Sequence, residues 1–205
     1  MSESVTTSGN RALEIVESAR TLFLENGYAG TSMAKVAMNV GIRKASLYHH
    51  FASKDELFIA CVVENFEDSV SEMRALRANT DIDDEQRLQR VFDIVYQSIV
   101  ESPIGQMSPI IAETSRSIPE VARQFFDNYI SKIQEAVGGI LEDSAARGVF
   151  RPMEPRAIEL MIFAPIVHTS LSLQMFGYFD DLAEHYDPQL TKAVHYDQVL
   201  RLLKN

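Results

Sequence analysis

The fold is decided by residues 31–51, which read T-S-M-A-K-V-A-M-N-V-G-I-R-K-A-S-L-Y-H-H-F. Thr31 is expected to cap a short helix over residues 32–40, because its hydroxyl can accept a hydrogen bond from a free N–H of the first turn. Gly41 predicts a tight turn, and a further short helix is expected over residues 44–51. Two short helices joined by a glycine turn are typical of the helix-turn-helix motif.

Helices are also expected on both sides of this stretch. Residues 11–26 place Ala12, Val16, Ala19 and Phe23 on one stripe, as in an amphipathic helix, and Gly27 is expected to end it. After the motif, Ser53 and Glu56 have the spacing of a capping box, which predicts a long helix running to about residue 77.

The rest of the chain has helical periodicity as well, and no segment alternates as a strand does. A polar, acidic linker is expected over residues 79–85 and an acidic loop over residues 180–187. Between and after them we expect helices at 84–101, 119–147, 155–177 and 188–203, an irregular helical piece at 104–118, and a kink at Pro165. The sequence therefore predicts an all-α protein with an N-terminal domain over residues 1–53 and a larger helical domain over residues 54–205.

Composition excludes several classes of protein. The chain has 205 residues and one cysteine, Cys61, so neither an intramolecular disulfide nor a multi-cysteine metal site is possible. The polar N-terminus has no secretory signal, and the longest apolar run, residues 160–167, is too short to span a membrane. No catalytic or dinucleotide-binding motif is present. We therefore expect a cytoplasmic protein that is not an enzyme, has no cofactor and no metal, and does not associate with a membrane.

The distribution of charge favours two parts with different partners. The net charge is −10, which taken alone argues against nucleic acid. Residues 1–63, however, carry as many basic as acidic side chains, and the whole acidic excess lies in residues 64–205.

The short helix after Gly41 carries side chains suited to DNA. It offers Arg43, Lys44, Ser46, Tyr48, His49 and His50. Lysine and arginine neutralise phosphates and read guanine, and serine and histidine can bond to phosphates or base edges. The N-terminus of the preceding helix, at Thr31 and Ser32, offers free N–H groups to a phosphate.

The segment from residue 12 to about residue 63 resembles the DNA-binding domain of the TetR family of bacterial transcriptional regulators. The resemblance rests on motifs that occur in order at the expected spacing: L-F-L-E-N-G-Y at 22–28, T-S-M at 31–33, the Gly41 turn, L-Y-H-H-F at 47–51 and S-K-D-E-L-F at 53–58. It implies that Thr31, Ser32 and Lys54 touch phosphate, and that Tyr48 and His49 reach the backbone or bases. One departure is Arg43, which stands where many relatives have a serine and cannot cap the helix as serine does.

The resemblance also implies a function for the second domain. Residues 54–205 would bind a small apolar or amphipathic effector and form a homodimer, and the effector would release a repressor from a near-palindromic operator. A domain rich in methionine and aromatic residues suits an adaptable pocket. The candidate lining residues are Phe92, Tyr96, Met107, Phe125, Tyr129, Phe163 and His168.

The segment 155–177 is apolar on all sides, so one side is expected to be covered by a second subunit. The candidate interface residues are Ala157, Met161, Ala164, Leu171 and Met175. A central helix buried within a monomer is the alternative.

Other interpretations stay open for several features. Tyr48 and His50 can be packing residues, and adjacent His49 and His50 diverge too far around a helix to share one metal ion easily. Cys61 is interpreted as a core thiol, with a redox sensor as the alternative. The alternatives for the whole protein are an activator, a ligand-independent regulator, or a helical ligand-binding protein or enzyme with a vestigial helix-turn-helix.

Overall fold

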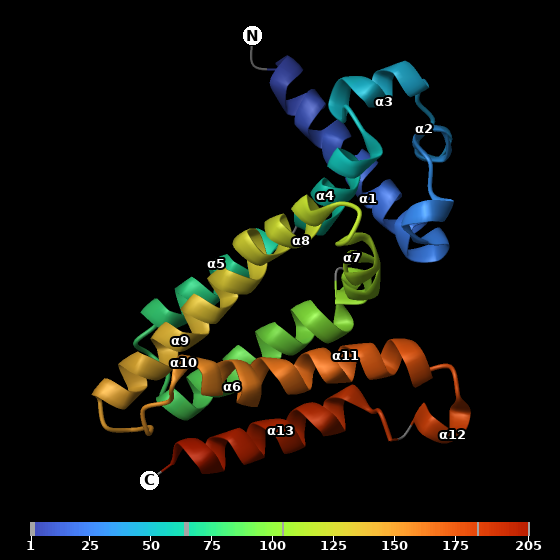
Figure 1. Cartoon of the computed structure of the whole chain (residues 1–205). Helices are drawn as coiled ribbons and strands as arrows, with labels where there is room; N and C mark the ends of the chain where they lie inside the picture. The colour runs from blue at the N-terminus through green and yellow to red at the C-terminus, as the bar shows by residue number, and fades with distance from the viewer. Residues whose placement is uncertain (1–2, 64–65, 104, 184, 205) are drawn as a thin grey trace. The chain divides into compact units, whose positions relative to one another are not determined.

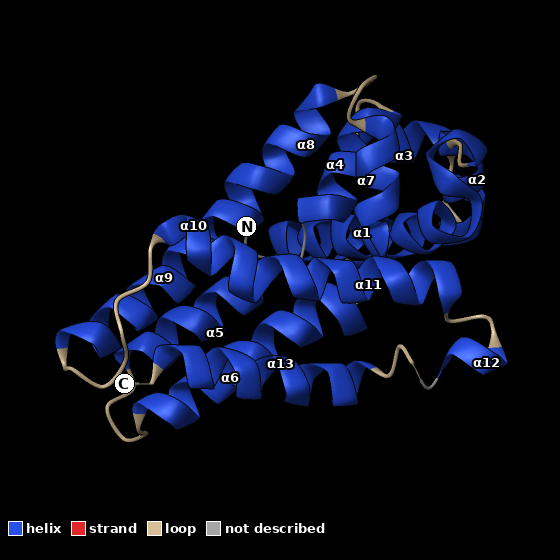
Figure 2. Cartoon of the chain, turned by 60° about the horizontal axis from the view of Figure 1, so that its bottom comes forward, coloured by secondary structure: helices blue, strands red, loops and turns tan. Residues whose placement is uncertain are grey.

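The computed structural model describes residues 3–63, 66–103, 105–183 and 185–204, and every regular element within these ranges is a helix (Figures 1 and 2). The predicted all-α fold is therefore confirmed. The chain divides into two compact units, one made of residues 1–64 and 107–126 and the other of residues 65–106 and 127–205. Each unit is described by itself.

The first unit contains the predicted helix-turn-helix. Its helices are α1 (Glu3–Gly30), α2 (Met33–Val40), α3 (Lys44–His50), α4 (Lys54–Val63), α7 (Ser108–Thr114) and α8 (Pro119–Phe125). Phe23 of α1, Leu47 of α3 and Phe58 of α4 are completely buried and form the centre of its core. Cys61 is buried with them, and its thiol lies 3.4 Å from the carbonyl oxygen of Val16, as the interpretation as a core thiol predicts.

Local signals place most helix ends of the first unit. Gly27 has a φ of 67° and interrupts α1, although residues up to Gly30 still belong to that helix. The capping box of α4 is present, because the Ser53 hydroxyl accepts a hydrogen bond from the Glu56 N–H. The Glu56 carboxylate in turn accepts one from the Ala52 N–H. The prediction that Thr31 caps α2 is wrong: Ser32 is the cap, and its hydroxyl accepts a hydrogen bond from the Lys35 N–H.

The second unit is a bundle of helices of very different lengths. They are α5 (Phe66–Ala78), α6 (Asp84–Tyr96) with its π-helical continuation η1 (Gln97–Glu101), α9 (Ser131–Ala146), α10 (Pro155–Ile158), η4 (Glu159–Phe163), α11 (Ala164–Phe176), α12 (Asp180–Ala183) and α13 (Pro188–Leu203). In Figure 1, α5 lies beside α9, and α11 lies beside α13. Two short helices, η2 (Gly105–Met107) and η3 (Phe126–Ile130), lie where the chain passes from one unit to the other.

A buried ion cluster closes the turn between α5 and α6. Arg87 and Asp84 are both almost fully buried, and their side chains pair at 2.6 Å. Arg87 also donates to the carbonyl oxygens of Leu76, Asn79 and Ile82, and Arg147 at the end of α9 donates to the Asp84 carboxylate. Because every member is hydrogen-bonded, the cluster ties three segments together without leaving a buried charge unpaired.

The sequence predicts continuous helices where the structure has three π-helical segments, η1, η3 and η4. The outer bounds of the predicted helices 84–101 and 188–203 agree with the structure. The expected loop at 180–187 is wrong in part, because it contains α12. The expected helix from residue 53 to 77 corresponds to α4 and α5. Residues 64 and 65 lie outside the described residues, so its continuity stays a prediction.

One segment, Pro155–Phe176, is long and apolar enough to cross a membrane by length and composition alone. It is also 39% buried inside the protein, where it packs against α13 and η1. Core helices of soluble proteins pass the same test, so this property is weak evidence for a membrane span.

Candidate nucleic-acid interface

The N-terminus of α2 is open to solvent. Ser32 is exposed, and its side chain satisfies only the N–H of Lys35. The other N–H groups of the first helical turn have no partner within a helix, and they carry the positive end of the helix dipole. Such a terminus can accept a phosphate.

Helix α3 presents most of the predicted DNA-binding residues from one short segment. Arg43 stands at its N-cap position and makes no side-chain capping bond, as its residue type predicts. Arg43, Lys44 and His49 are exposed, and Ser46 is half-buried. Leu47 has no exposed surface and fixes the helix to the core of the unit. Helix α3 is therefore anchored by one side chain and offers cationic and polar groups on its other faces.

Tyr48 and His50 differ in how far they are exposed. The Tyr48 side chain is 44% exposed, and the Lys44 ammonium lies 5.8 Å from the centre of its ring. His50 is half-buried near the end of α3. Tyr48 thus remains available to a ligand, as its prediction requires.

Lys54, at the start of α4, lies against an aromatic ring. Its ammonium is 3.9 Å from the centre of the Tyr28 ring, and the Tyr28 hydroxyl donates a hydrogen bond to the Asp55 carboxylate. Burial lowers the pKa of Lys54, although the nearby Asp55 charge acts in the opposite direction. Burial and the hydrogen bond to Asp55 raise the pKa of Tyr28.

Thr31 has a different environment from the other candidates. Its side chain is only 2% exposed, and its hydroxyl lies 2.9 Å from the carbonyl oxygens of both Leu22 and Gly27. This threonine ties the end of α1 to the start of α2. Its contact with phosphate stays a prediction, as do the contacts of the other residues named for DNA.

The candidate effector-binding residues do not form one described cavity. Phe92, Tyr96, Tyr129 and Phe163 are buried in the second unit, whereas Met107 and Phe125 belong to the first. His168 is exposed on α11. Whether these residues line a pocket stays a prediction.

Two polar contacts lie among the buried aromatic residues of the second unit, and the sequence reasoning missed one partner in each. The hydroxyl of Tyr129 is 2.7 Å from that of Ser98, and the hydroxyl of Tyr96 is 3.1 Å from Nδ1 of His195. Burial raises the pKa of each tyrosine to about 12. Polar atoms in such a core fix the orientation of the side chains around them.

The sequence carries a signal at Pro165, which marks a carbonyl oxygen in need of a donor but does not identify His195 as that donor. Proline has no N–H, so Met161, four residues earlier, loses the donor that an α-helix would supply to its carbonyl oxygen. The structure places His195 Nε2 2.7 Å from this oxygen. Nε2 therefore carries the proton and donates a hydrogen bond to the Met161 carbonyl oxygen, which leaves Nδ1 to accept the hydrogen bond of the Tyr96 hydroxyl.

The predicted interface residues lie on an exposed apolar face of the second unit, which we call the α11 face. It contains Leu160, Met161, Ala164, Val167, Leu171 and Met175, all of them exposed. From Met161 onward, their spacing of three and four residues keeps them on one side of the helical segment, and Leu160 lies next to Met161. Ala157, the remaining candidate, is half-buried. Exposed apolar side chains on one side of a helical segment are compatible with a subunit interface, which stays a prediction.

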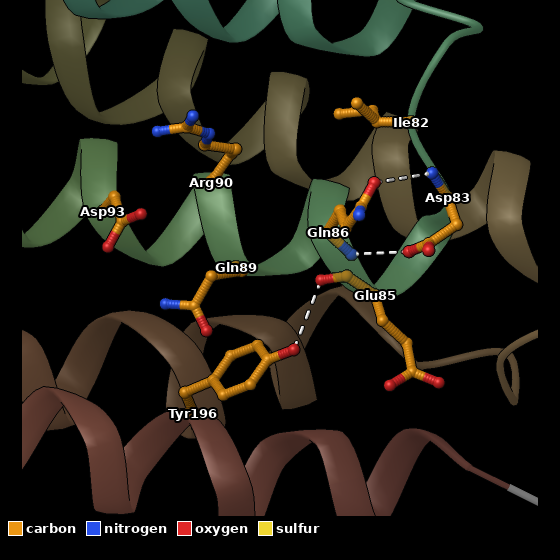
Figure 3. A pocket seen from close by; sticks show the side chains of 8 residues that line it. All are labelled: Ile82, Asp83, Glu85, Gln86, Gln89, Arg90, Asp93 and Tyr196. Carbon is orange, nitrogen blue, oxygen red and sulfur yellow. Dashed lines mark hydrogen bonds between the residues drawn. The ribbon is translucent and has the colours of Figure 1, made fainter.

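Two open grooves occur in the second unit, and neither is lined by a candidate effector residue. Figure 3 shows the larger, of about 770 Å³, where the Tyr196 hydroxyl of α13 points toward Glu85 at the start of α6. Most of its lining side chains carry polar groups, and the Tyr196 hydroxyl donates to the Glu85 carbonyl oxygen across it. The smaller groove, of about 560 Å³, lies between α5, α9 and α10.

Comparison with known proteins connects the first unit to a family. Residues 15–61 match the family model described as bacterial regulatory proteins of the tetR family. The chain is 31% identical over 134 residues to the negative transcriptional regulator IcaR of the biofilm operon icaADBC from Staphylococcus aureus (strain Newman). That match covers 59% of this chain and 71% of IcaR.

Solved structures of similar fold cover nearly the whole chain. A transcriptional regulator from Saccharomonospora viridis, solved in complex with choline, has a TM-score of 0.77 at 17% identity and covers 97% of this chain and 99% of its own. FadR from Bacillus subtilis, solved in complex with stearoyl-CoA, has a TM-score of 0.68 at 18% identity, with coverage of 92% and 96%. At these identities the likeness establishes the fold alone.

Proposed function

Because the chain belongs to the TetR family of bacterial transcriptional regulators, we propose that it is an operator-binding repressor that a small apolar or amphipathic molecule releases from DNA. Its relative IcaR is a negative transcriptional regulator, which favours repression over activation. DNA binding is assigned to residues 1–53 together with Lys54 at the start of α4, and effector binding and dimerisation to the rest of residues 54–205.

The observation that carries this proposal is the surface of α3. Arg43 and Lys44 are exposed at its N-terminus, with no side-chain cap on the helix, so cationic groups and free N–H groups lie together. Ser32 at the open end of α2 and Lys54 at the start of α4 supply further phosphate contacts in the same unit. Tyr48 and His49 are assigned to the DNA backbone or bases.

Selection of DNA from a randomised duplex pool tests the proposal. We expect the purified protein to enrich one near-palindromic sequence, because two recognition helices of a dimer reach half-sites about 34 Å apart. Enrichment of no sequence over successive rounds would contradict it. A reporter gene placed behind the selected sequence then separates repression from activation.

Dimerisation through the α11 face is supported by its exposed apolar side chains. The fractions exposed are 55% for Leu160 and 62% for Met175, values that a subunit interface would reduce. The exposed Leu190 and Val194 of α13 extend the apolar surface available to a partner. The proposed partner is a second copy of this chain.

An effector can release DNA only if it binds the DNA-incompetent conformation more tightly. Two proteins of similar fold were solved with choline, a small cation, and with stearoyl-CoA, an amphipathic thioester, and these two compounds serve as first probes. The proposed site in the second unit lies around Phe92, Tyr96, Tyr129 and Phe163. Calorimetry should show that the selected duplex weakens effector binding by the same free energy as the effector weakens DNA binding, about 1–3 kcal/mol. An effector of equal affinity in both titrations would contradict the release mechanism.

Two further assignments complete the proposal. The protein acts in the cytoplasm, where its operator lies, and it acts by binding rather than by catalysis. The family of regulators and the absence of catalytic motifs in the sequence both support this view.

A further inference from the structure

Three aromatic rings pack together between the end of α1 and the start of α4. Tyr28 stacks on Phe23 with 5.9 Å between the ring centres, and its edge meets Phe58 at 5.2 Å. Phe23 and Phe58 are fully buried, whereas Tyr28 is half-buried. The Tyr28 ring is therefore held in place by the core while part of it remains at the surface.

The surface part of the Tyr28 ring is occupied by a cation. The Lys54 ammonium lies 3.9 Å from the ring centre, well inside the distance of about 6 Å at which a cation and an aromatic face attract each other. The next residue, Asp55, accepts a hydrogen bond from the Tyr28 hydroxyl. One side chain thus contacts both the positive and the negative residue that open α4.

We infer that Tyr28 is a positioning residue for DNA binding, which holds the Lys54 ammonium at the place where it meets a phosphate. The inference rests on the proposed phosphate contact of Lys54. A free lysine side chain loses conformational entropy when it is immobilised. A lysine already held on a rigid ring loses less of it on binding, so its phosphate contact contributes more to affinity.

The hydroxyl of Tyr28 has a separate effect. Asp55 is adjacent to Lys54, and its negative charge competes with phosphate for the ammonium. A hydrogen bond from a neutral hydroxyl gives the carboxylate another partner and reduces that competition. The ring and the hydroxyl therefore act in the same direction.

A double-mutant cycle between Tyr28 and Lys54 tests the inference, with fluorescence anisotropy of a labelled duplex selected by the wild-type protein. Lys54→Ala should weaken binding and reduce the slope of log affinity against log salt by about 0.9, the value for one phosphate contact. Tyr28→Leu should weaken binding about 2- to 5-fold, the range of an exposed cation–π contact. Tyr28→Phe keeps the ring and should retain most of the affinity.

The decisive result is the double variant. If Tyr28 acts through Lys54, Tyr28→Leu has no further effect on affinity in the Lys54→Ala background. The matched control is Lys35→Ala on α2, whose ammonium contacts the Gly30 carbonyl oxygen instead, and its effect should add to that of Tyr28→Leu. An equal loss from Tyr28→Leu with and without Lys54 would overturn the positioning role and leave the phosphate contact intact. An unchanged salt slope in Lys54→Ala would overturn the contact itself.

Proton NMR of the wild-type protein provides a test that requires no variant to fold. The ε-methylene protons of Lys54 should resonate upfield of those of the other lysines, because they lie over the ring. Unshifted Lys54 protons would overturn the inference. Thermal melts of the Tyr28 variants separate a loss of fold from a loss of positioning.

Discussion

At the scale of single residues, Arg43 and Lys44 are adjacent and exposed at the start of α3, yet they are expected to contribute differently to DNA binding. Lys44→Ala should weaken binding to all sequences and flatten the salt dependence, because a lysine–phosphate contact releases counterions. Arg43→Ala should instead relax the preference at one base position, by about 1–3 kcal/mol for a bidentate contact. Titrations against salt with the selected and single-base-changed duplexes distinguish the two, and unchanged affinity in both variants would contradict the assignment.

The buried carboxylate of Asp84 is expected to be essential for stability. Asp84→Ala leaves the buried Arg87 without its carboxylate partner, and we expect a loss of about 2–3 kcal/mol in the free energy of unfolding. The control is Asp143→Ala, which breaks the exposed pair with Arg77 and should cost less than about 1 kcal/mol. Chemical denaturation measures both. Equal losses in the two variants would show that burial does not decide the effect.

Lowering the pH should remove the stability that the Asp84 carboxylate contributes. Burial alone would raise the pKa of Asp84, but the hydrogen bond and charge of Arg147 and the charge of Arg87 lower it overall. A carboxyl group whose folded pKa is lowered stabilises the protein fully above its unfolded pKa of about 4, and the stability is lost as the pH falls below that value.

Residue types alone predicted some of these features and missed others. The missing cap at Arg43 followed from its side chain, because a guanidinium has no acceptor. The choice between Thr31 and Ser32 did not follow, because both hydroxyls can cap a helix. Tertiary contacts decide it: Thr31 is turned into the core, where it meets the Leu22 and Gly27 carbonyl oxygens.

At the scale of secondary-structure elements, protonation of His195 is expected to weaken helix packing and so to make the stability of the protein depend on pH. Burial lowers the pKa of His195, although the hydrogen bond to the Met161 carbonyl oxygen acts in the opposite direction. The unfolded chain therefore binds this proton more readily, and stability should fall as the pH drops from about 6.5 towards the lowered folded value. His195→Gln should lack this component. Thermal melts of both proteins over this range check it, and identical pH profiles would contradict it.

The α11 face gives a second prediction at this scale. Ala164→Glu and Leu171→Glu each place a charge on the proposed subunit interface, where it would be desolvated without a partner, and should yield monomers that bind DNA weakly. Ala146→Glu, at an exposed position on α9, is the matched control and should leave the dimer intact. Sedimentation at micromolar concentration measures the oligomeric state. A monomeric wild-type protein would contradict the interface.

Helix ends were more predictable than helix interiors. The start of α13 at Pro188 and the start of α6 after Asp83 follow from local capping, which a short stretch of sequence encodes. The π-helical segments were not foreseen. At η4, Pro165 removes a donor, but the replacement comes from His195, which lies 34 residues from Met161 along the chain. No local pattern records such a partner.

At the scale of the whole molecule, the helix-turn-helix could be recognised because its motifs are contiguous. Which helices make up the first compact unit could not be predicted from the sequence, because α7 and α8 join α1 and α4 from positions far along the chain. The same limit applies to the effector site: single buried aromatic residues were identified, but not the hydroxyl pair of Ser98 and Tyr129.

Every role proposed for this protein depends on recognition of a specific DNA sequence by the first unit. The most direct measurement is the affinity of the wild-type protein for the selected duplex and for a scrambled duplex of the same length at physiological salt. We predict that the selected duplex binds at least about 10³-fold more tightly, the lower end for specific regulators. Equal affinity for the two duplexes would contradict sequence-specific DNA recognition by this protein.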